Sequence, residues 1–166
     1  IHVSDLGPLR LKKGVVGITE LLEPKQKVLV QVMKEPTGNK GPRLTGNISL
    51  PGKYLILQPY GQGVNISRKI NTENERSRLR ALGVLIKPPS TGMLFRTEAE
   101  QIKEELLIED LENLIQQWDQ VTKTSETSNP PNLISRDEDF SLKILRDCIT
   151  SSTNKIIIDN KSAIEK

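Results

Sequence analysis

Three short stretches of the sequence combine positive charge with small or hydroxyl-bearing neighbours. Lys40 lies in a Gly-Asn-Lys-Gly turn, where its ammonium group can approach a phosphate without obstruction. Arg68 and Lys69 follow a serine in a predicted short strand. Arg96 and Thr97 offer a guanidinium fork, a hydroxyl and a backbone N–H, which suits a terminal phosphate. An ion pair between Arg96 and an acidic residue just downstream is the alternative, and the spacing leaves both open.

The other residue types that can carry chemistry favour structural roles. His2 has no identifiable partner for metal binding or proton transfer, and Cys148 falls on the apolar face of a predicted helix. Glu105 and Glu109 share a helix face and could hold magnesium, but such acids usually form the solvated face. The glycines of Gly61–Gly63 lack the third glycine and helix start of a nucleotide-binding loop. We therefore predict no catalytic residue and no metal ligand in this chain.

Composition and charge narrow the class of protein. Apolar runs such as Lys155–Asp159 are too short to span a bilayer, and the single cysteine excludes an internal disulfide framework. The absence of a disulfide framework indicates a reducing compartment.

The charges are distributed unequally along the chain. Residues 1–96 carry 16 Lys/Arg against 6 Asp/Glu, and residues 97–166 carry 8 Lys/Arg against 15 Asp/Glu. This asymmetry favours a polyanionic partner for the first part, although a solvated basic surface explains it too. Because the chain opens at Ile1 in strand-like sequence, we expect it to be cut from a longer protein.

The first fifty residues are predicted to form β-structure. Lys27–Lys34 is β-branched and alternating, and Arg43–Leu50 can pair with it. The loop between them contains two glycines and two prolines, which places Lys40 at a hairpin tip and Arg43 at its base. Leu50–Gly52 is expected to join two domains.

A second unit is predicted to mix strands and helices. Thr72 is a good N-cap for a helix that ends before Pro88-Pro89, and a long helix is expected at about 100–122. Strands are expected at 54–59, 65–70 and 92–96. A Ser/Thr/Asn/Pro-rich linker, 122–132, precedes a helix at 138–149, a strand at 155–159 and the start of a further helix.

Four ordered motifs stand out along the chain: Lys34–Thr45, Ile48–Leu57, Gly63–Ile70 and Phe95–Thr97. With these motifs the sequence resembles the ribonuclease E/G family, and the match continues through Asp110-Leu111, Trp118 and Ile158–Asn160. The resemblance covers practically the whole chain and is closest to the cyanobacterial and algal-plastid branch.

The resemblance implies an α+β fold in three parts. Residues 1–50 are expected to be the C-terminal part of an S1 domain, a partial β-barrel of the OB type. Residues 51–128 are expected to be a mixed α/β 5′-sensor subdomain. Residues 129–166 are expected to be an incomplete RNase H-like α/β segment without a nuclease role.

Site residues follow from the same motifs. Lys40 matches the S1-domain lysine that contacts RNA, Arg68 matches a basic residue bordering the sensor pocket, and we expect Arg43 to bind RNA as well. In the expected pocket, Arg96 and Thr97 hold the 5′ monophosphate. Gly52 and Ile56 line the pocket, and Ile56 replaces a more usual valine.

The family is known for magnesium-dependent endonucleolytic cleavage of single-stranded RNA in messenger decay and ribosomal RNA maturation. The resemblance therefore implies the RNA-binding, 5′-monophosphate-sensing portion of such an enzyme. The catalytic aspartates that hold Mg²⁺, and the zinc-linking cysteines, are expected downstream of Lys166, so this chain alone is predicted to be inactive. The family's base-stacking aromatics are expected before Ile1, which weakens RNA binding by this piece.

Partner and location are further expectations. The partner is single-stranded RNA with a 5′ monophosphate, no membrane span is expected, and a homo-oligomer of the full-length protein is left open. The plastid stroma is the expected location, with the bacterial cytoplasm as the alternative. Two other readings stay open: a non-catalytic S1/OB-type RNA-binding adaptor, and a protein-interaction module that docks through the acidic helix Glu104–Asp119.

Overall fold

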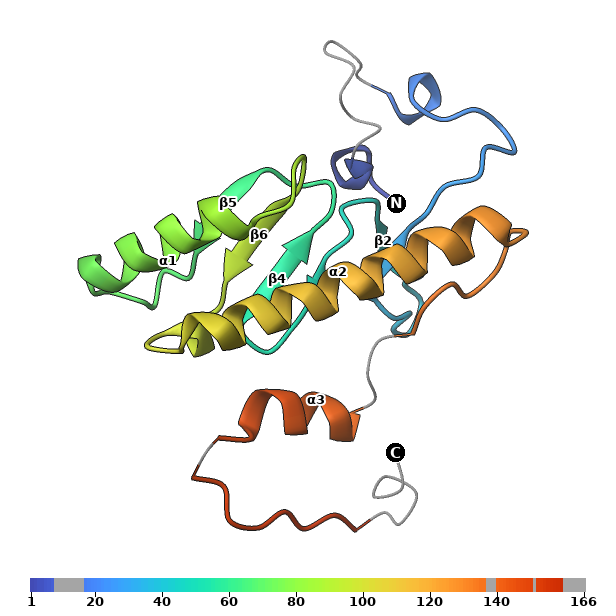
Figure 1. Ribbon diagram of the computed structural model, residues 1–166. Coiled ribbons are helices and arrows are strands. Elements are labelled where there is room, and N and C mark those ends of the chain that lie inside the picture. Colours follow the sequence, from blue (N-terminus) through green and yellow to red (C-terminus); the bar gives the residue numbers. More distant parts are fainter. Residues whose placement is uncertain (8–16, 137–139, 151, 160–166) are drawn as a thin grey trace. The chain divides into compact units, whose positions relative to one another are not determined.

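The computed structural model describes residues 1–7, 17–136, 140–150 and 152–159 (Figure 1). The chain divides into two compact units, residues 1–132 and residues 133–166. The described secondary structure is mixed α and β, which confirms the α+β class. The domain boundaries expected near residues 50 and 128 stay predictions.

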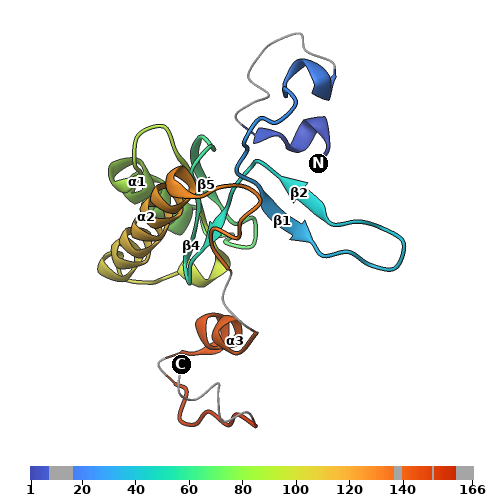
Figure 2. The same ribbon diagram turned by 90° about the vertical axis from the view of Figure 1, so that its right-hand side faces the viewer.

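The predicted basic hairpin is present with shorter strands (Figure 2). Strand β1 (Gln31–Lys34) pairs antiparallel with β2 (Arg43–Thr45), with an irregularity in register between Val32 and Lys34. The backbones of Thr37 and Lys40 exchange two hydrogen bonds of 3.0 Å, which close the turn. The described residues preceding the hairpin add two short 3₁₀ helices, η1 (Val3–Asp5) and η3 (Ile18–Glu20). Among the described residues the strands form one two-stranded and one four-stranded sheet, neither of which closes into a barrel.

The four-stranded sheet has the order β3-β4-β6-β5. Its strands β3, β4 and β6 are antiparallel to their neighbours, whereas β5 and β6 are parallel. The strands are β3 (Leu50–Pro51), β4 (Leu55–Gln58), β5 (Gly63–Ile66) and β6 (Gly92–Phe95). Residues 50 and 51, expected in a domain joint, thus form an edge strand of this sheet.

Helix α1 (Glu73–Ile86) connects the parallel strands β5 and β6, as such a crossover requires. It starts at the predicted N-cap Thr72 and ends at Lys87, immediately before Pro88, because proline and the residue before it disfavour helix. The short 3₁₀ helix η4 (Thr97–Ala99) follows β6.

The long helix α2 (Glu104–Thr127) extends beyond the predicted range into the stretch expected to be a linker. In this continuation the threonine hydroxyls bond to the helix itself. Thr122, Thr124 and Thr127 each donate a side-chain hydrogen bond to a carbonyl one turn earlier, at 3.2, 2.8 and 3.2 Å. Their polar groups are satisfied within the helix, and Val121 is buried against the rest of the unit.

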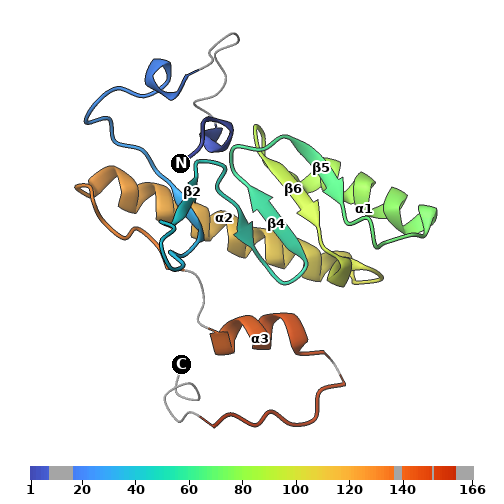
Figure 3. The ribbon, with the colours of Figure 1, turned by 180° about the vertical axis from the view of Figure 1, so that it is seen from behind.

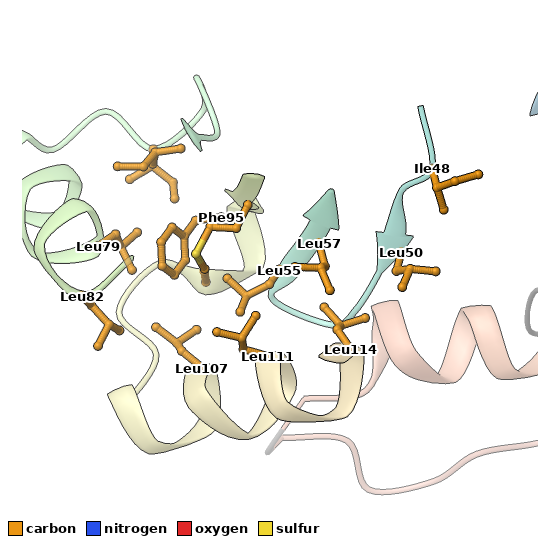
Figure 4. Packing of buried hydrophobic residues seen from close by; sticks show 14 residues of the cluster. Ile48, Leu50, Leu55, Leu57, Leu79, Leu82, Phe95, Leu107, Leu111 and Leu114 are labelled. Atoms are coloured by element: carbon orange, nitrogen blue, oxygen red, sulfur yellow. The ribbon is translucent and has the colours of Figure 1, made fainter. Parts of the chain in front are cut away.

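Both helices cover the same face of the sheet (Figures 1 and 3). The core between them contains the inward-facing residues of β4 and β6 together with one stripe of each helix (Figure 4). The stripe of α2 repeats every three or four residues, as the sequence predicts. The principal core residues are Leu55, Leu57, Met93, Phe95, Leu79, Leu82, Leu107, Leu111 and Leu114.

Gly83 allows α1 to approach the sheet closely. A Cβ atom at this position would lie 2.6 Å from Cγ1 of Val64 on β5 and 2.8 Å from Cε2 of Phe95 on β6. Since interiors are packed at crystal-like density, these neighbours have little room to move. Glycine here sets the distance between helix and sheet.

The second unit contains α3 (Phe140–Cys148), close to the predicted helix. Cys148 is exposed, which corrects its predicted place on the apolar face of this helix. Lys155–Asp159 does not form the predicted strand, because the described part of this unit provides no neighbouring strand to bond with. The further helix predicted at the end lies outside the described residues.

Candidate anion-binding site

Most of the predicted phosphate-binding residues lie at one edge of the four-stranded sheet, where β5 and β6 end and β4 begins. Strands β5 and β6 are parallel and pair Ile66 with Phe95, so their carboxyl ends lie side by side. The next residues along the chain are Ser67 and Arg96. Leu55, at the start of β4, also pairs with Phe95, which brings the β3–β4 turn to this same edge.

Arg96 reaches from the end of β6 into the β3–β4 turn. Its backbone N–H donates to the carbonyl of Tyr54 at 2.8 Å. Its Nη1 donates to the carbonyl oxygens of Gly52 at 2.6 Å and Lys53 at 3.1 Å. Its Nε lies 3.4 Å from Oε2 of Glu98, and its side chain is 18% exposed. The sequence left open a phosphate-binding role and an ion pair for Arg96. In the structure its guanidinium lies at Gly52, the predicted pocket residue, and also pairs with the downstream acid Glu98.

Thr97 presents its hydroxyl to the neighbouring strand end. Its Oγ1 lies 3.0 Å from Oγ of Ser67, and either oxygen can donate. The loop that carries Ser67 is fixed from α1, because Nη1 of Arg76 donates to the carbonyls of Ser67 at 2.9 Å and Ile70 at 3.0 Å. Two hydroxyl groups thus lie together where β5 and β6 end.

Gly52 and Ile56 both belong to the β3–β4 hairpin. Gly52 is buried and donates its N–H to the carbonyl of Leu55 at 2.8 Å. Ile56 is half-buried and pairs with Leu94 of β6. Because side chains alternate along strands, Ile56, Leu94 and Arg96 share the sheet face opposite α1 and α2. The structure brings Arg96 to Gly52 directly and leaves Ile56 on the adjoining apolar surface.

Several charges surround this edge. Arg68 and Lys69 are exposed and lie in a turn after β5, not in the predicted strand. Lys53 lies in the β3–β4 turn, with Nζ 5.5 Å from the centre of the Tyr54 ring. Glu98 forms an ion pair with Arg96, and its side chain is 43% exposed. An incoming phosphate would meet a basic edge that contains one competing carboxylate.

A charged cluster fixes the segment that follows Thr97. The Glu75 carboxylate of α1 lies 2.7 Å from Nη2 of Arg78 and accepts from the backbone N–H of Gln101 at 2.9 Å. Arg78 also donates to the carbonyl of Ile102 at 3.0 Å. The hydrogen bond from Arg78 lowers the pKa of Glu75, and the same contact raises the pKa of Arg78. The cluster therefore holds the chain between η4 and α2.

The other predicted RNA-binding residues lie in the β1–β2 hairpin, which is a separate sheet. Lys40 is exposed in the hairpin loop. Arg43 pairs with Asp5 at 3.2 Å but keeps 55% of its side chain exposed. Both are accessible to a polyanion.

The sequence favoured structural roles for the histidine and the acidic residues of α2. Glu105 and Glu109 are exposed on α2, and the His2 ring lies 2.7 Å from the Ser4 hydroxyl. Across the described ranges, no three His, Cys, Asp or Glu side chains gather in a way that could hold a metal ion. No helix in these ranges has the length and apolar character needed to cross a bilayer.

Two residues near the site, Ser67 and Asp110, were not predicted as site residues from the sequence, whereas Glu98 is the downstream acid of the alternative interpretation of Arg96. No sequence signal identifies Ser67, because its placement depends on the parallel pairing of β5 and β6. Asp110 carries a clearer signal, because it interrupts the apolar stripe between Leu107 and Leu114. Its carboxylate accepts hydrogen bonds from three successive backbone N–H groups of the β3–β4 hairpin.

Comparison with known proteins agrees with the motifs. The model of the ribonuclease E/G family matches residues 49–166, which include the sheet edge described above. The chain belongs to the ribonuclease E/G family.

Relatives from cyanobacteria and red algae align along the entire chain. A ribonuclease E of Synechocystis is 60% identical over 166 residues, which are 100% of this chain and 25% of that protein. A ribonuclease E of Nostoc is 57% identical, again over 100% of this chain and 24% of that protein. A ribonuclease E/G-like protein of Pyropia yezoensis is 47% identical, over 100% of this chain and 33% of that protein. The chain thus spans about a quarter to a third of the length of these curated relatives.

Proposed function

We propose that this chain is the RNA-binding and 5′-monophosphate-sensing portion of a single-strand-specific endoribonuclease that acts in RNA processing and messenger decay. Membership of the ribonuclease E/G family supports the enzyme class. The observation that carries the sensing role is that consecutive residues at the end of β6 present a guanidinium at the Gly52 turn (Arg96) and a hydroxyl at Ser67 (Thr97).

The chemistry of a terminal phosphate fits these groups. A 5′ monophosphate carries more negative charge and more acceptor oxygens than an internal phosphodiester. A guanidinium binds such oxygens through charge-assisted bonds, and the Thr97 hydroxyl can add a further donor. A 5′ hydroxyl offers none of this charge. We therefore expect the site to distinguish RNA ends, with Ile56 lining its apolar side.

The remaining basic residues are proposed to guide the RNA strand. Lys40, Arg43 and Arg68 are exposed and can contact phosphates along the backbone. Such contacts position the strand, depend strongly on salt and carry little sequence information. They would strengthen binding of RNA with either type of 5′ end.

Catalysis is proposed to need other parts of the protein. The resemblance assigns magnesium to aspartates downstream of Lys166, and we predict that this chain alone does not cut RNA. Residues 1–50 are proposed as S1-type and residues 129–166 as RNase H-like. The cyanobacterial and red algal relatives support a plastid stroma or a bacterial cytoplasm as the location, and a homo-oligomer of the full-length protein is an open expectation.

The test is cleavage by the full-length polypeptide that carries this chain. Two versions of one single-stranded RNA, with a 5′ monophosphate or a 5′ hydroxyl, are compared for kcat/KM. We expect faster cleavage of the monophosphate, and loss of this preference in Arg96→Gln. Arg80→Gln, which removes an exposed guanidinium of α1, is the matched control and should keep the preference. Equal cleavage of both RNAs by the unchanged protein would refute the sensing role. Binding without any cleavage would favour the RNA-binding adaptor.

A further inference from the structure

The β3–β4 turn is held by opposite charges on its two sides. On one side, the Asp110 carboxylate of α2 accepts hydrogen bonds from the backbone N–H groups of Lys53 at 3.0 Å, Tyr54 at 2.9 Å and Leu55 at 2.9 Å. On the other side, Nη1 of Arg96 donates to the carbonyls of Gly52 and Lys53. The turn lies between an anion and a cation that both bind its backbone.

The two sets of hydrogen bonds share the same peptide groups. The carbonyl of Gly52 and the N–H of Lys53 belong to one peptide unit, and the carbonyl of Lys53 and the N–H of Tyr54 belong to the next. A trans peptide unit is planar, with its N–H and C=O pointing in opposite directions. When Asp110 fixes the N–H directions, it therefore fixes the directions in which both carbonyls meet Arg96.

Electrostatics strengthens this arrangement. A carboxylate that accepts from an amide N–H polarises the amide, which makes its carbonyl a better acceptor. The guanidinium of Arg96 is mostly buried and donates to both of these carbonyls. Asp110 thus acts on Arg96 through two polarised peptide groups without contacting it.

Gly52 is required for the close approach of Asp110. A Cβ atom at position 52 would lie 2.6 Å from Oδ2 and 2.7 Å from Oδ1 of Asp110. Any side chain there would push the carboxylate away from the turn. The need for glycine at this position is thereby explained by Asp110, independently of any contact between Gly52 and a ligand.

Asp110 differs from its acidic neighbours on α2. Glu109 and Glu112 are exposed, whereas Asp110 is half-buried in the stripe that contains Leu107, Leu111 and Leu114. A partly buried carboxylate needs compensating donors, and here the turn supplies three. The sequence places an acid in an apolar stripe because the turn above it requires an acceptor.

We propose that Asp110 is a positioning residue for the 5′-phosphate site. Through the β3–β4 turn, Asp110 holds the guanidinium of Arg96 at the sheet edge. This inference rests on the proposed sensing function. Asp110 itself does not touch RNA. Its loss should leave phosphate-independent RNA binding intact and remove the advantage of a 5′ monophosphate.

The experiment measures binding of two single-stranded RNAs by the full-length polypeptide in a buffer without magnesium. Both carry a fluorescent label at the 3′ end, and they differ only in a 5′ monophosphate or a 5′ hydroxyl. Asp110→Asn keeps the size of the side chain but replaces one acceptor oxygen by an NH₂ group that faces backbone donors. Glu109→Gln is the matched control, since it removes an exposed carboxylate from the adjacent position.

We expect Asp110→Asn to reduce the affinity ratio between the two RNAs at least about tenfold, which corresponds to about 1.4 kcal/mol. Affinity for the hydroxyl-ended RNA should stay within about twofold, and Glu109→Gln should change neither value. In an Arg96→Gln background, Asp110→Asn should have no further effect on the ratio, because both changes act on one contact. A purely structural role would weaken both RNAs alike in either background.

The other outcomes separate this inference from the proposed function. If the unchanged protein binds both RNAs equally, the sensing function fails. If it prefers the monophosphate and Asp110→Asn keeps that preference, the positioning role is wrong and the sensing function stands. Should Asp110→Asn unfold, Asp110→Glu is read by the same criteria, because it retains the charge but displaces the carboxylate. Unfolding of both variants would overturn the proposal, since Asp110 would then stabilise the whole unit and not the site.

Discussion

Removing the Glu98 carboxylate should increase the affinity for 5′-phosphorylated RNA. Glu98 lies 3.4 Å from Nε of Arg96, the group proposed to bind the phosphate. A phosphate must compete with this carboxylate for the guanidinium and is also repelled by it. Glu98→Gln removes both effects and keeps the size of the side chain.

The magnitude follows from the exposure of the pair. With Glu98 43% exposed, the ion pair contributes about 0.2–1 kcal/mol. Repulsion between Glu98 and a phosphate of charge about −1.5 to −2, at about 6 Å in water, adds about 1 kcal/mol. The total of about 1–2 kcal/mol predicts an affinity gain of about 5- to 30-fold.

Fluorescence anisotropy with 3′-labelled RNA at low salt measures this gain. Only the monophosphate RNA should bind more tightly, and the gain should shrink as salt screens the charges. Glu105→Gln, an exposed acid on α2, removes the same formal charge at a distance from Arg96 and is the control. An equal gain for the hydroxyl-ended RNA, or no gain, would refute the placement of the phosphate at Arg96.

Three further predictions concern stability and RNA binding. The pKa of Glu75 is held below its usual value near 4.5, so its contribution to the free energy of unfolding is full above pH 4.5 and is lost as the pH falls through the lowered pKa. Acid titration followed by circular dichroism should therefore show that Glu75→Gln is less stable by about 1–3 kcal/mol at neutral pH and less sensitive to acid. Gly83→Ala should lower the melting temperature, because overpacking against Val64 and Phe95 costs about 1–3 kcal/mol and the gain in helix propensity is only about 1 kcal/mol; an unchanged or raised melting temperature would show that the core adapts. Lys40→Ala should weaken binding of both RNA ends equally and reduce the slope of log affinity against log salt by about 1, whereas a change confined to one RNA end would contradict its backbone role.

The sequence predicted the elements of the larger unit because local signals and burial agree there. Thr72 and Pro88 bound α1, and the leucines of α2 repeat at helical spacing. The extension of α2 to Thr127 was missed, because Ser/Thr-rich composition favours a linker and the burial of Val121 is a tertiary contact that composition does not show. The strand expected at Lys155–Asp159 was wrong, because strand propensity cannot supply a partner strand.

The candidate site was predictable only in part. Arg96 and Thr97 were selected by residue type, and Gly52 by resemblance to the family. The contact of Thr97 with Ser67 depends on the parallel pairing of β5 and β6, which the sequence does not specify. The role of Asp110 depends on the position of α2 over a turn more than fifty residues away in the chain. Long-range placement, not residue type, was the missing information.

A crystal structure of the protein bound to a short 5′-phosphorylated RNA tests the central claim most directly. The terminal phosphate is expected within hydrogen-bonding distance of the Arg96 guanidinium and the Thr97 hydroxyl, with Glu98 displaced. A phosphate bound elsewhere, with Arg96 still paired to Glu98, would contradict it.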